Sequence, residues 1–225
     1  MKKELFLVAF IGFLIWNCKQ QADAAKPKVD ELVTEAKTTS QIPSIVEELF
    51  EFANVSHTAT TDINELMLFK EIDQKELIHE IDMDRAVSLY KQLMKRKEST
   101  SFPIFEIKGA ETAILSIQGI GYGGAIWAKV LVDKNTLEIK KIAFDHKAES
   151  EGYGAAMTGA SFENQFVGNT IDFDKNNFRL ERQIEKRTDD GSIVEGISGA
   201  TMTSEAVVEM VNIGLRRYKA YLLGH

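Results

Sequence analysis

The chain has 225 residues, of which 44% are hydrophobic and 27% carry charge. This balance is typical of a soluble globular protein, and the length suffices for one well-buried domain with an appendage. The net charge of −7 argues against a nucleic-acid partner. Cys18 is the only cysteine, which excludes a disulfide within the chain.

Residues 1–25 have the pattern of an export signal. Lys2 and Lys3 form a short basic start, and an uninterrupted apolar run follows from Leu5 to Trp16. A membrane-spanning helix needs about 20 apolar residues, so this run is too short to span a bilayer and fits the hydrophobic region of a signal peptide. We therefore expect the body of the protein on the extracytoplasmic (periplasmic) side of the membrane.

The signal segment fits three processing alternatives. Ile15-Trp16-Asn17-Cys18 resembles a lipoprotein processing box, in which Cys18 becomes the lipidated first residue. Ala22-Asp23-Ala24 is an Ala-x-Ala site that predicts cleavage after Ala24. The third alternative is an uncleaved anchor. The cysteine directly after a short apolar run favours a lipoprotein anchored to the membrane at Cys18.

Residues 26–100 are expected to hold a polar tether and a helical flank. Segment 58–81 fits either a helix or a broken pair of strands. The histidines here lack metal-ligand spacing, so no metal site is expected. Asp82 is placed to cap a firmer helix. The apolar face of that helix comprises Met83, Ala86, Val87, Tyr90, Leu93 and Met94.

From residue 101 the pattern changes to strands, and residues 101–225 are expected to form one domain. Helical patterns precede and follow the strands, so the predicted fold class is α+β, an antiparallel or mixed sheet with flanking helices. A further strand is expected between 171 and 187. The other runs rich in β-formers are 104–107, 113–117, 126–132 and 138–145.

The segment Ser198–Ser204 joins a loop of small and hydroxyl residues to a C-terminal helix. Thr203 or Ser204 is a good N-cap. Backbone N–H groups and the helix dipole favour an anion at a helix N-terminus, so the loop suits a phosphate, either bound or esterified to Thr201. Ordinary helix capping is the alternative. The helix is predicted from one apolar stripe: Val207, Met210, Val211, Gly214, Leu215, Tyr218 and Leu222.

Two further loops contain glycines. Gly119–Gly124 has spacings that mimic nucleotide fingerprints, but a strand follows from Ile126, whereas a dinucleotide site needs a helix there. A glycine-rich hairpin or bulge is therefore predicted. Asp145–Gly154 is either an acidic solvated turn or a binding loop whose glycines leave backbone N–H groups exposed.

Three motifs together resemble the FMN-binding domain family. Glu195–Thr201 resembles its flavinylation motif, His146–Gly154 its ring loop, and Phe162–Gly168 its Phe-x-x-Gln-Phe-x-Gly stretch. The resemblance implies FMN joined covalently by a phosphodiester to Thr201, a bond made by a flavin transferase. It also implies phosphate-end contacts from Ser198, Gly199, Ala200, Met202 and Thr203. The ring contacts that it implies are Glu149, Ser150, Gly152, Tyr153 and Gly154.

The resemblance implies an exported electron-transfer flavoprotein more than a stand-alone enzyme, because the flavin supplies the redox chemistry. The family includes the C subunit of sodium-pumping NADH:quinone reductase and the G subunit of the Rnf complex. A subunit of that kind is the first alternative. A non-redox binding lipoprotein that kept the fold is the second. The expected partners are the flavin transferase, a membrane redox complex or another electron donor or acceptor, and the membrane itself through the lipid anchor.

Overall fold

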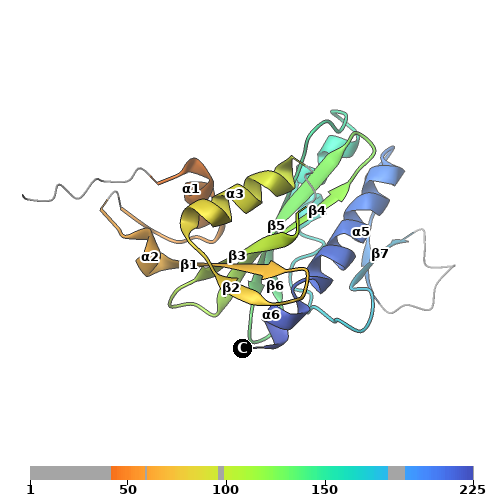
Figure 1. Ribbon diagram of the computed structural model, residues 1–225. Helices are drawn as coiled ribbons and strands as arrows, with labels where there is room; N and C mark the ends of the chain where they lie inside the picture. Colours follow the sequence, from red (N-terminus) through yellow and green to blue (C-terminus); the bar gives the residue numbers. More distant parts are fainter. Residues whose placement is uncertain (1–41, 59, 96–98, 182–190, 225) are drawn as a thin grey trace, which may run out of the picture. The chain divides into compact units, whose positions relative to one another are not determined.

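The computed structural model describes residues 42–58, 60–95, 99–181 and 191–224, all within one compact unit, Thr39–His225 (Figure 1). The predictions for residues 1–25, including lipidation of Cys18 and cleavage after Ala24, lie outside the described residues. Within the described ranges, no helix combines the length and the apolar composition that crossing a membrane requires.

A six-stranded sheet forms the centre of the fold. Neighbouring strands are antiparallel, in the order β2-β1-β3-β4-β5-β6. The predicted α+β class is therefore confirmed. The further strand expected after residue 171 is β7 (Phe178–Leu180), which pairs in parallel with β8 (Ser192–Val194). The strands of the main sheet are β1 (Met67–Asp73), β2 (Ile78–Glu80), β3 (Ser101–Ile107), β4 (Thr112–Ile120), β5 (Ala125–Asp133) and β6 (Ile139–His146).

The segment 58–81, which fits either a helix or strands, contains one short helix followed by two strands. After the short helix α2 (Ile63–Leu66), β1 pairs with β3 along its whole length, and β2 pairs with β1. Met67, Phe69 and Ile72 of β1 are buried. The flank before residue 101 therefore adds two strands to the main sheet, because this pairing satisfies its backbone groups and buries its apolar side chains.

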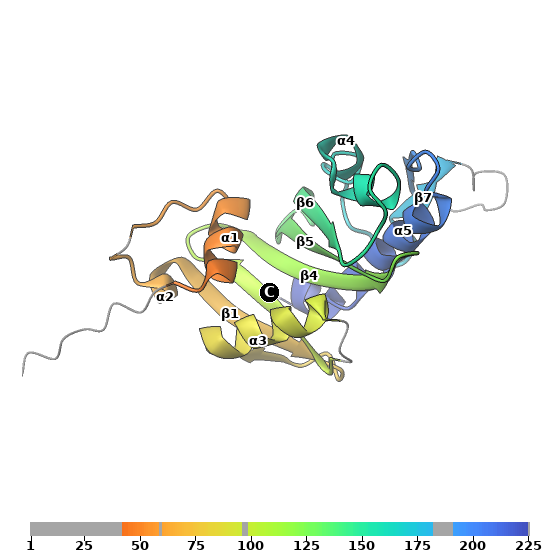
Figure 2. The same cartoon turned by 90° about the horizontal axis from the view of Figure 1, so that it is seen from above.

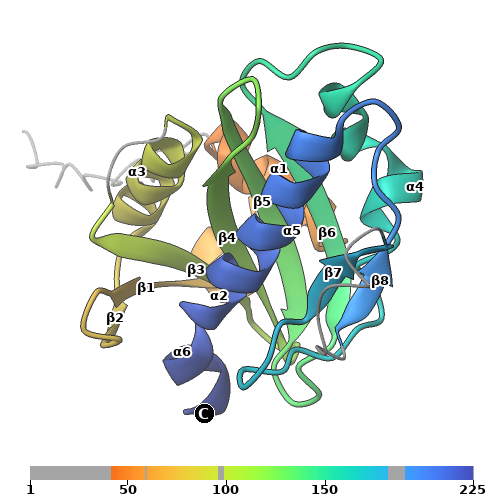
Figure 3. The same ribbon diagram turned by 90° about the vertical axis from the view of Figure 1, so that its right-hand side faces the viewer.

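Helices cover both faces of the sheet (Figure 2, Figure 3). α1 (Ser44–Phe52) and α3 (Met83–Met94) lie on one face, and α5 (Thr201–Arg216) crosses the other before α6 (Lys219–Leu223). Side chains alternate along β4. Ile114 accordingly joins the apolar cluster under α1 and α3, whereas its neighbour Leu115 joins the cluster under α5. Each helix face thus has its own core.

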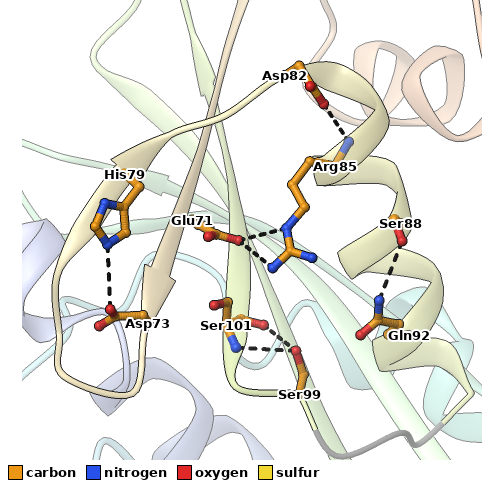
Figure 4. Close-up of polar contacts among 9 residues, drawn as sticks. All are labelled: Glu71, Asp73, His79, Asp82, Arg85, Ser88, Gln92, Ser99 and Ser101. Carbon is orange, nitrogen blue, oxygen red and sulfur yellow. Dashed lines mark hydrogen bonds and ion pairs between the residues drawn. The ribbon is translucent and has the colours of Figure 1, made fainter.

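Side chains hold the N-terminus of α3. Asp82, the expected cap, accepts a hydrogen bond from the backbone N–H of Arg85 at 2.7 Å. The Arg85 guanidinium reaches Glu71 of β1, with Nε and Nη2 each 3.1 Å from Oε2 (Figure 4). The cap prediction is therefore confirmed, and the ion pair fixes the helix on the sheet. The predicted face is buried at Ala86, Val87, Tyr90 and Leu93, whereas Met83 and Met94 are only partly buried and Leu89, outside the prediction, is buried too.

The Phe-x-x-Gln-Phe segment starts in the short helix α4 (Ala160–Glu163). Phe162 and Phe166 are buried, and their ring centroids lie 5.5 Å apart. Gln165 faces the other way, and its side-chain oxygen accepts a hydrogen bond from the Glu195 N–H at 2.7 Å. The segment therefore supplies core and also anchors the chain shortly before the loop that precedes α5.

Candidate functional site

The first residue of α5 is Thr201, and Ala200 occupies the N-cap position. Thr203 and Ser204 lie inside the first turn, so the prediction that one of them caps the helix is wrong. Their hydroxyl groups bind elsewhere. The Ser204 hydroxyl donates to the Ala200 carbonyl at 2.9 Å and accepts from the Ile197 N–H at 2.9 Å. These bonds fold the preceding loop onto the helix, and the helix therefore starts earlier than the capping pattern suggests.

The N-terminus of α5 is open. The helix is 16 residues long, yet its N-cap residue Ala200 provides no side-chain hydrogen bond, and among the described residues no side chain accepts from the N–H groups of its first turn. Ser198, Gly199 and Thr201 are exposed, and Met202 is 61% exposed. Gly199 has φ +73°, a conformation that favours glycine. This end therefore has the features that favour an anion, with a hydroxyl at the first helical position.

Glu149 connects α5 to the glycine-rich loop. Its Oε2 atom accepts a hydrogen bond from the Thr203 hydroxyl at 2.8 Å, and its Oε1 atom accepts one from the Gly123 N–H at 2.7 Å. The residue is buried, with 7% of its surface exposed. Hydrogen bonds to a carboxylate are stronger than neutral ones. One side chain thus ties together segments that lie 26 and 54 residues away along the chain.

Two glycines leave space for this carboxylate, and a third leaves space for the backbone just before it. A Cβ atom at Gly121 would lie 2.3 Å from Glu149 Oε1, and one at Gly154 would lie 2.2 Å from Oε2. A Cβ atom at Gly123 would lie 2.1 Å from the carbonyl oxygen of Ala148. Because such distances are far below van der Waals contact, any side chain at these positions would displace Glu149 or its loop.

The glycine-rich segment is a hairpin between β4 and β5, as predicted. The Gly121 N–H donates to the Gly124 carbonyl at 2.8 Å, and Gly124 has φ +136°. Gly119 lies in β4, two residues before Gly121. A Cβ atom on Gly119 would lie 2.9 Å from the Cβ atom of Met210. The absence of a side chain there lets α5 pack directly on β4, which brings the helix start close to the hairpin.

The ring loop is a compact turn between β6 and the short 3-10 helix η1 (Gly154–Thr158). The Ser150 carbonyl accepts hydrogen bonds from the N–H groups of Tyr153 and Ala155, both at 3.1 Å. Gly152 has φ +74°, which favours glycine at this position. Ser150, Gly152 and Tyr153 are exposed, whereas Gly154 is buried against Glu149.

Tyr153 brings the ring loop into contact with the loop before α5. Its Cδ1 atom lies 2.9 Å from the place that a Cβ atom would take on Gly199. The residue is 57% exposed, and Tyr122 in the hairpin is 75% exposed. An exposed aromatic side chain close to the open helix end offers a planar ligand a surface on which to stack.

The structure brings the two predicted halves of the site together. The residues assigned to the phosphate lie at the exposed start of α5, and the loop assigned to the ring lies beside them. Glu149 and Thr203 differ from the others because their side chains bind each other, and they are buried, as Ala200 and Gly154 are. Sequence reasoning missed this pairing. The signal that could have indicated it is the presence of Glu149 together with two glycine-containing motifs, the hairpin and the ring loop. A buried carboxylate needs hydrogen-bond donors and the space that glycines leave.

Comparison with known proteins identifies this region. Residues 121–216 match the FMN-binding domain family. The predicted resemblance to this family is therefore confirmed over these residues. The matched range of the FMN-binding domain starts in the hairpin, includes the ring loop and ends with α5, so it contains Glu149, Tyr153 and Thr201.

Two curated relatives of the FMN-binding domain are each named as the C subunit of Na⁺-translocating NADH-quinone reductase. The protein from Yersinia pestis is 27% identical over 126 residues, which cover 53% of this chain and 47% of the relative. The protein from Chlamydia trachomatis is 27% identical over 128 residues, which cover 50% of this chain and 40% of the relative. The chain therefore spans less than half the length of either relative.

Solved structures of such proteins share the fold. The C subunit of Na⁺-translocating NADH-quinone reductase from Parabacteroides distasonis is 25% identical with a TM-score of 0.61, covering 80% of this chain and 91% of that chain. NqrC from Shewanella oneidensis is 16% identical with a TM-score of 0.59, covering 80% of this chain and 95% of that chain. The second likeness concerns the fold alone.

Proposed function

We propose that this protein is an exported electron-transfer flavoprotein that carries FMN joined by a phosphodiester to Thr201. The observation that carries the proposal is the open N-terminus of α5, with an exposed hydroxyl at its first position, inside an FMN-binding domain. Three features of this end suit a phosphate. Its N–H groups are uncapped, it is the positive end of the helix dipole, and Gly199 lets a bulky group approach the backbone.

At the phosphate end, the Thr201 Oγ1 atom would supply the bridging oxygen of the phosphodiester. The backbone N–H groups of Met202 and Thr203 are free to bond the remaining phosphate oxygens, because no side chain occupies them. When bound, FMN supplies the redox chemistry, and the protein holds and tunes it. The loop residues that line the approach are Ser198, Gly199 and Ala200.

At the ring end, the exposed Ser150, Gly152 and Tyr153 form the contact surface. The N–H groups of this turn that bond no other group of the described chain, such as that of Gly152, would be donors for the electron-rich edge of a reduced flavin, and Tyr153 would contribute an aromatic face. Glu149 is buried beneath this surface and supports it. Its hydrogen bonds to Thr203 and Gly123 fix the distance between the ring loop, the helix start and the hairpin.

We further propose that the protein is anchored on the extracytoplasmic side by lipid on Cys18. The support is the sequence, in which a cysteine directly follows an apolar run that is too short to span a bilayer. A covalent flavin suits this location, because a dissociable cofactor would be lost there. Cys18→Ser is expected to move the protein from the membrane fraction to the soluble fraction. Unchanged membrane association would refute the lipid anchor.

A role as one component of a membrane redox complex is the second candidate. It is supported by the likeness to proteins named as the C subunit of Na⁺-translocating NADH-quinone reductase. In that case the native protein, extracted with mild detergent, should co-purify with other redox proteins of the complex. An electron carrier that works alone should migrate as a single small species. A protein that remains colourless after co-expression with a flavin transferase would instead support a non-redox binding lipoprotein.

The attachment point is tested by Thr201→Ala in protein that is co-expressed with a flavin transferase. This change removes the only atom through which the proposed bond can form, so flavin fluorescence in a denaturing gel should vanish. Thr201→Ser keeps a hydroxyl and should retain part of the signal.

Ser161→Ala is the control, since Ser161 is an exposed hydroxyl residue of α4 outside the proposed site. It should retain the fluorescence, and the signal that remains in Thr201→Ser shows that a change at this position does not by itself damage the loop. Thr203 is a poor control because its hydroxyl binds Glu149. Covalent flavin that survives in Thr201→Ala would show that the attachment point is another residue.

A further inference from the structure

The strand β4 has a free edge over its last residues. On one side it pairs with β5 along its whole length, from Thr112 to Ile120. On the other side it pairs with β3 only through Ala113, Ile114 and Leu115. Among the described residues, no strand therefore lies beside the end of β4 on the β3 side.

Tyr218 marks the start of this free edge. Its hydroxyl accepts a hydrogen bond from the Ser116 N–H at 3.2 Å and donates to the Ser116 carbonyl at 2.6 Å. It also lies 3.3 Å from the carbonyl oxygen of Pro103, a residue that has no N–H with which to continue the ladder. Burial raises the pKa of the Tyr218 phenol, so the group remains a donor at neutral pH. The tyrosine replaces one rung of strand pairing, and the ladder does not resume.

The backbone beyond Ser116 presents hydrogen-bonding groups to the gap. Strand residues alternate in direction, so the N–H and C=O groups of Gln118 and Ile120 point to the same side as those of Ser116. The groups of Ile117 and Gly119 point to β5. Gln118 and Ile120 thus offer two sets of donors and acceptors, two residues apart, as the edge of a sheet does.

A pocket of about 920 Å³ lies along this edge. Lys95, Lys147 and Arg217 line it, each from a different part of the fold, and no acidic side chain lines it among the described residues. No carboxylate of the described chain forms an ion pair with these three cations. The pocket is therefore positively charged around an unpaired strand.

Buried polar atoms without partners gather at the same place. In the part of the chain that the structure describes, four buried side-chain nitrogen or oxygen atoms have no hydrogen-bond partner. Three of them belong to residues on this edge or in this pocket: Ser116 Oγ, Gln118 Oε1 and Arg217 Nη1. Such atoms are costly to leave unpaired, and water or a bound partner in the pocket would supply hydrogen bonds close to them.

We propose that the free edge of β4 binds an extended acidic segment of a partner protein, which adds to the main sheet as a further strand. The backbone groups of Gln118 and Ile120 would bond the main chain of that segment, and the three cations would bind its carboxylates. A strand accounts for the repeat of free groups at every second residue, which a single small anion does not need. Because every charged side chain that lines the pocket is basic, complementarity selects acidic sequences.

The docked segment would lie close to the proposed flavin without contacting the attachment point. Gly123 lines the pocket, and its N–H is also the donor to Glu149. The hairpin is thus the wall between the two sites. The docking proposal does not depend on flavin attachment, because none of the residues that carry it belongs to the α5 N-terminus.

The test uses two fluorescent peptides, one of alternating Thr and Glu and one of alternating Thr and Lys, with flavin-loaded protein and with Thr201→Ala protein. Only the Glu peptide should bind, and added salt should weaken its binding. In hydrogen exchange, the Gln118 and Ile120 amides should become protected by the Glu peptide. The Ile117 and Gly119 amides already pair with β5 and should not change.

Two charge reversals provide matched variants. Lys147→Glu places a like charge in the pocket and should weaken binding by about tenfold or more. Lys75→Glu changes an exposed lysine in the turn between β1 and β2, outside the pocket, and should alter binding by less than about twofold. Equal binding of both peptides, or binding without protection of the Gln118 and Ile120 amides, would overturn the proposal. If flavin loading alone protected the Gln118 and Ile120 amides and abolished peptide binding, the docking proposal would also be overturned, and the pocket would be assigned to the flavin.

Discussion

A side chain caps the N-terminus of α3, whereas the N-cap residue of α5 provides no side-chain cap. The Asp82 side chain caps α3 and accepts a hydrogen bond from the Arg85 N–H at 2.7 Å. Ala200 occupies the corresponding position of α5 and provides no side-chain acceptor. A cap is worth about 1 kcal/mol, so the second helix forgoes a stabilisation that the first one uses.

The difference lies in what the nearby carboxylate binds. At α3 the carboxylate of Asp82 binds the helix backbone. At α5 the carboxylate of Glu149 binds the Thr203 hydroxyl and the Gly123 N–H, and thus leaves the backbone of the first turn available. A helix end that is held in place without being capped is suited to a ligand that supplies the cap itself.

The largest effect is expected for Glu149→Ala, which removes the side chain that holds the open helix end. Two buried donors, the Thr203 hydroxyl and the Gly123 N–H, would lose their acceptor, and the free energy of unfolding should fall by about 2 to 3 kcal/mol. Urea denaturation measures the loss. Glu151→Ala, at an exposed neighbour, is the control and should cost less than about 0.5 kcal/mol. Equal stabilities would mean that Glu149 does not tie the loops together.

Gly152→Val should have the next largest effect, because it strains the loop that faces the open end. A β-branched residue at φ +74° costs about 1 to 2 kcal/mol and should also alter the absorption spectrum of the bound flavin. Gly152→Asn is the matched variant, since asparagine tolerates this region of backbone space. The spectrum should follow backbone strain and therefore change less in the asparagine variant. If both variants keep the wild-type spectrum, the loop does not contact the ring.

Asp82→Ala makes the N-terminus of α3 resemble that of α5. The loss of the side-chain cap should lower the free energy of unfolding by about 1 kcal/mol, while flavin attachment should remain unchanged. Asp84→Ala, which removes an exposed carboxylate from the first turn without removing the cap, should cost less. A loss of flavin in Asp82→Ala would show that the two faces of the sheet are coupled.

Met202→Asp makes the end of α5 resemble that of α3, with the smallest effect on stability. A carboxylate in the exposed first turn should stabilise the flavin-free protein by about 0.3 to 1 kcal/mol through the helix dipole. The same charge should oppose the phosphate and reduce covalent flavin. Met202→Asn has a similar shape without the charge and should retain more flavin. Thermal unfolding and gel fluorescence measure the two effects, and a simultaneous increase in both would contradict the anion site.

Local features of the sequence predicted a large part of this structure. The stripe from Val207 to Leu215 predicted α5, although its last residues, Tyr218 and Leu222, lie beyond the end of that helix at Arg216. Asp82 was recognisable as the cap of α3, because helix periodicity and capping depend on residues close in sequence. The glycine-rich segment was recognisable as a hairpin because β-forming residues flank it. The three family motifs likewise predicted which loops would make up the site.

Tertiary structure decided what the polar side chains bind. Thr203 and Ser204 are residue types that commonly cap helices. In the structure Thr203 instead binds a carboxylate 54 residues away, and Ser204 binds the loop before the helix. A hydroxyl group or a carboxylate can form hydrogen bonds of similar energy with many partners, and the fold determines which of them is near. The sequence around Ser116 predicted a strand. Only the fold shows that the pairing of this strand with β3 ends at Leu115, which leaves its last residues with a free edge.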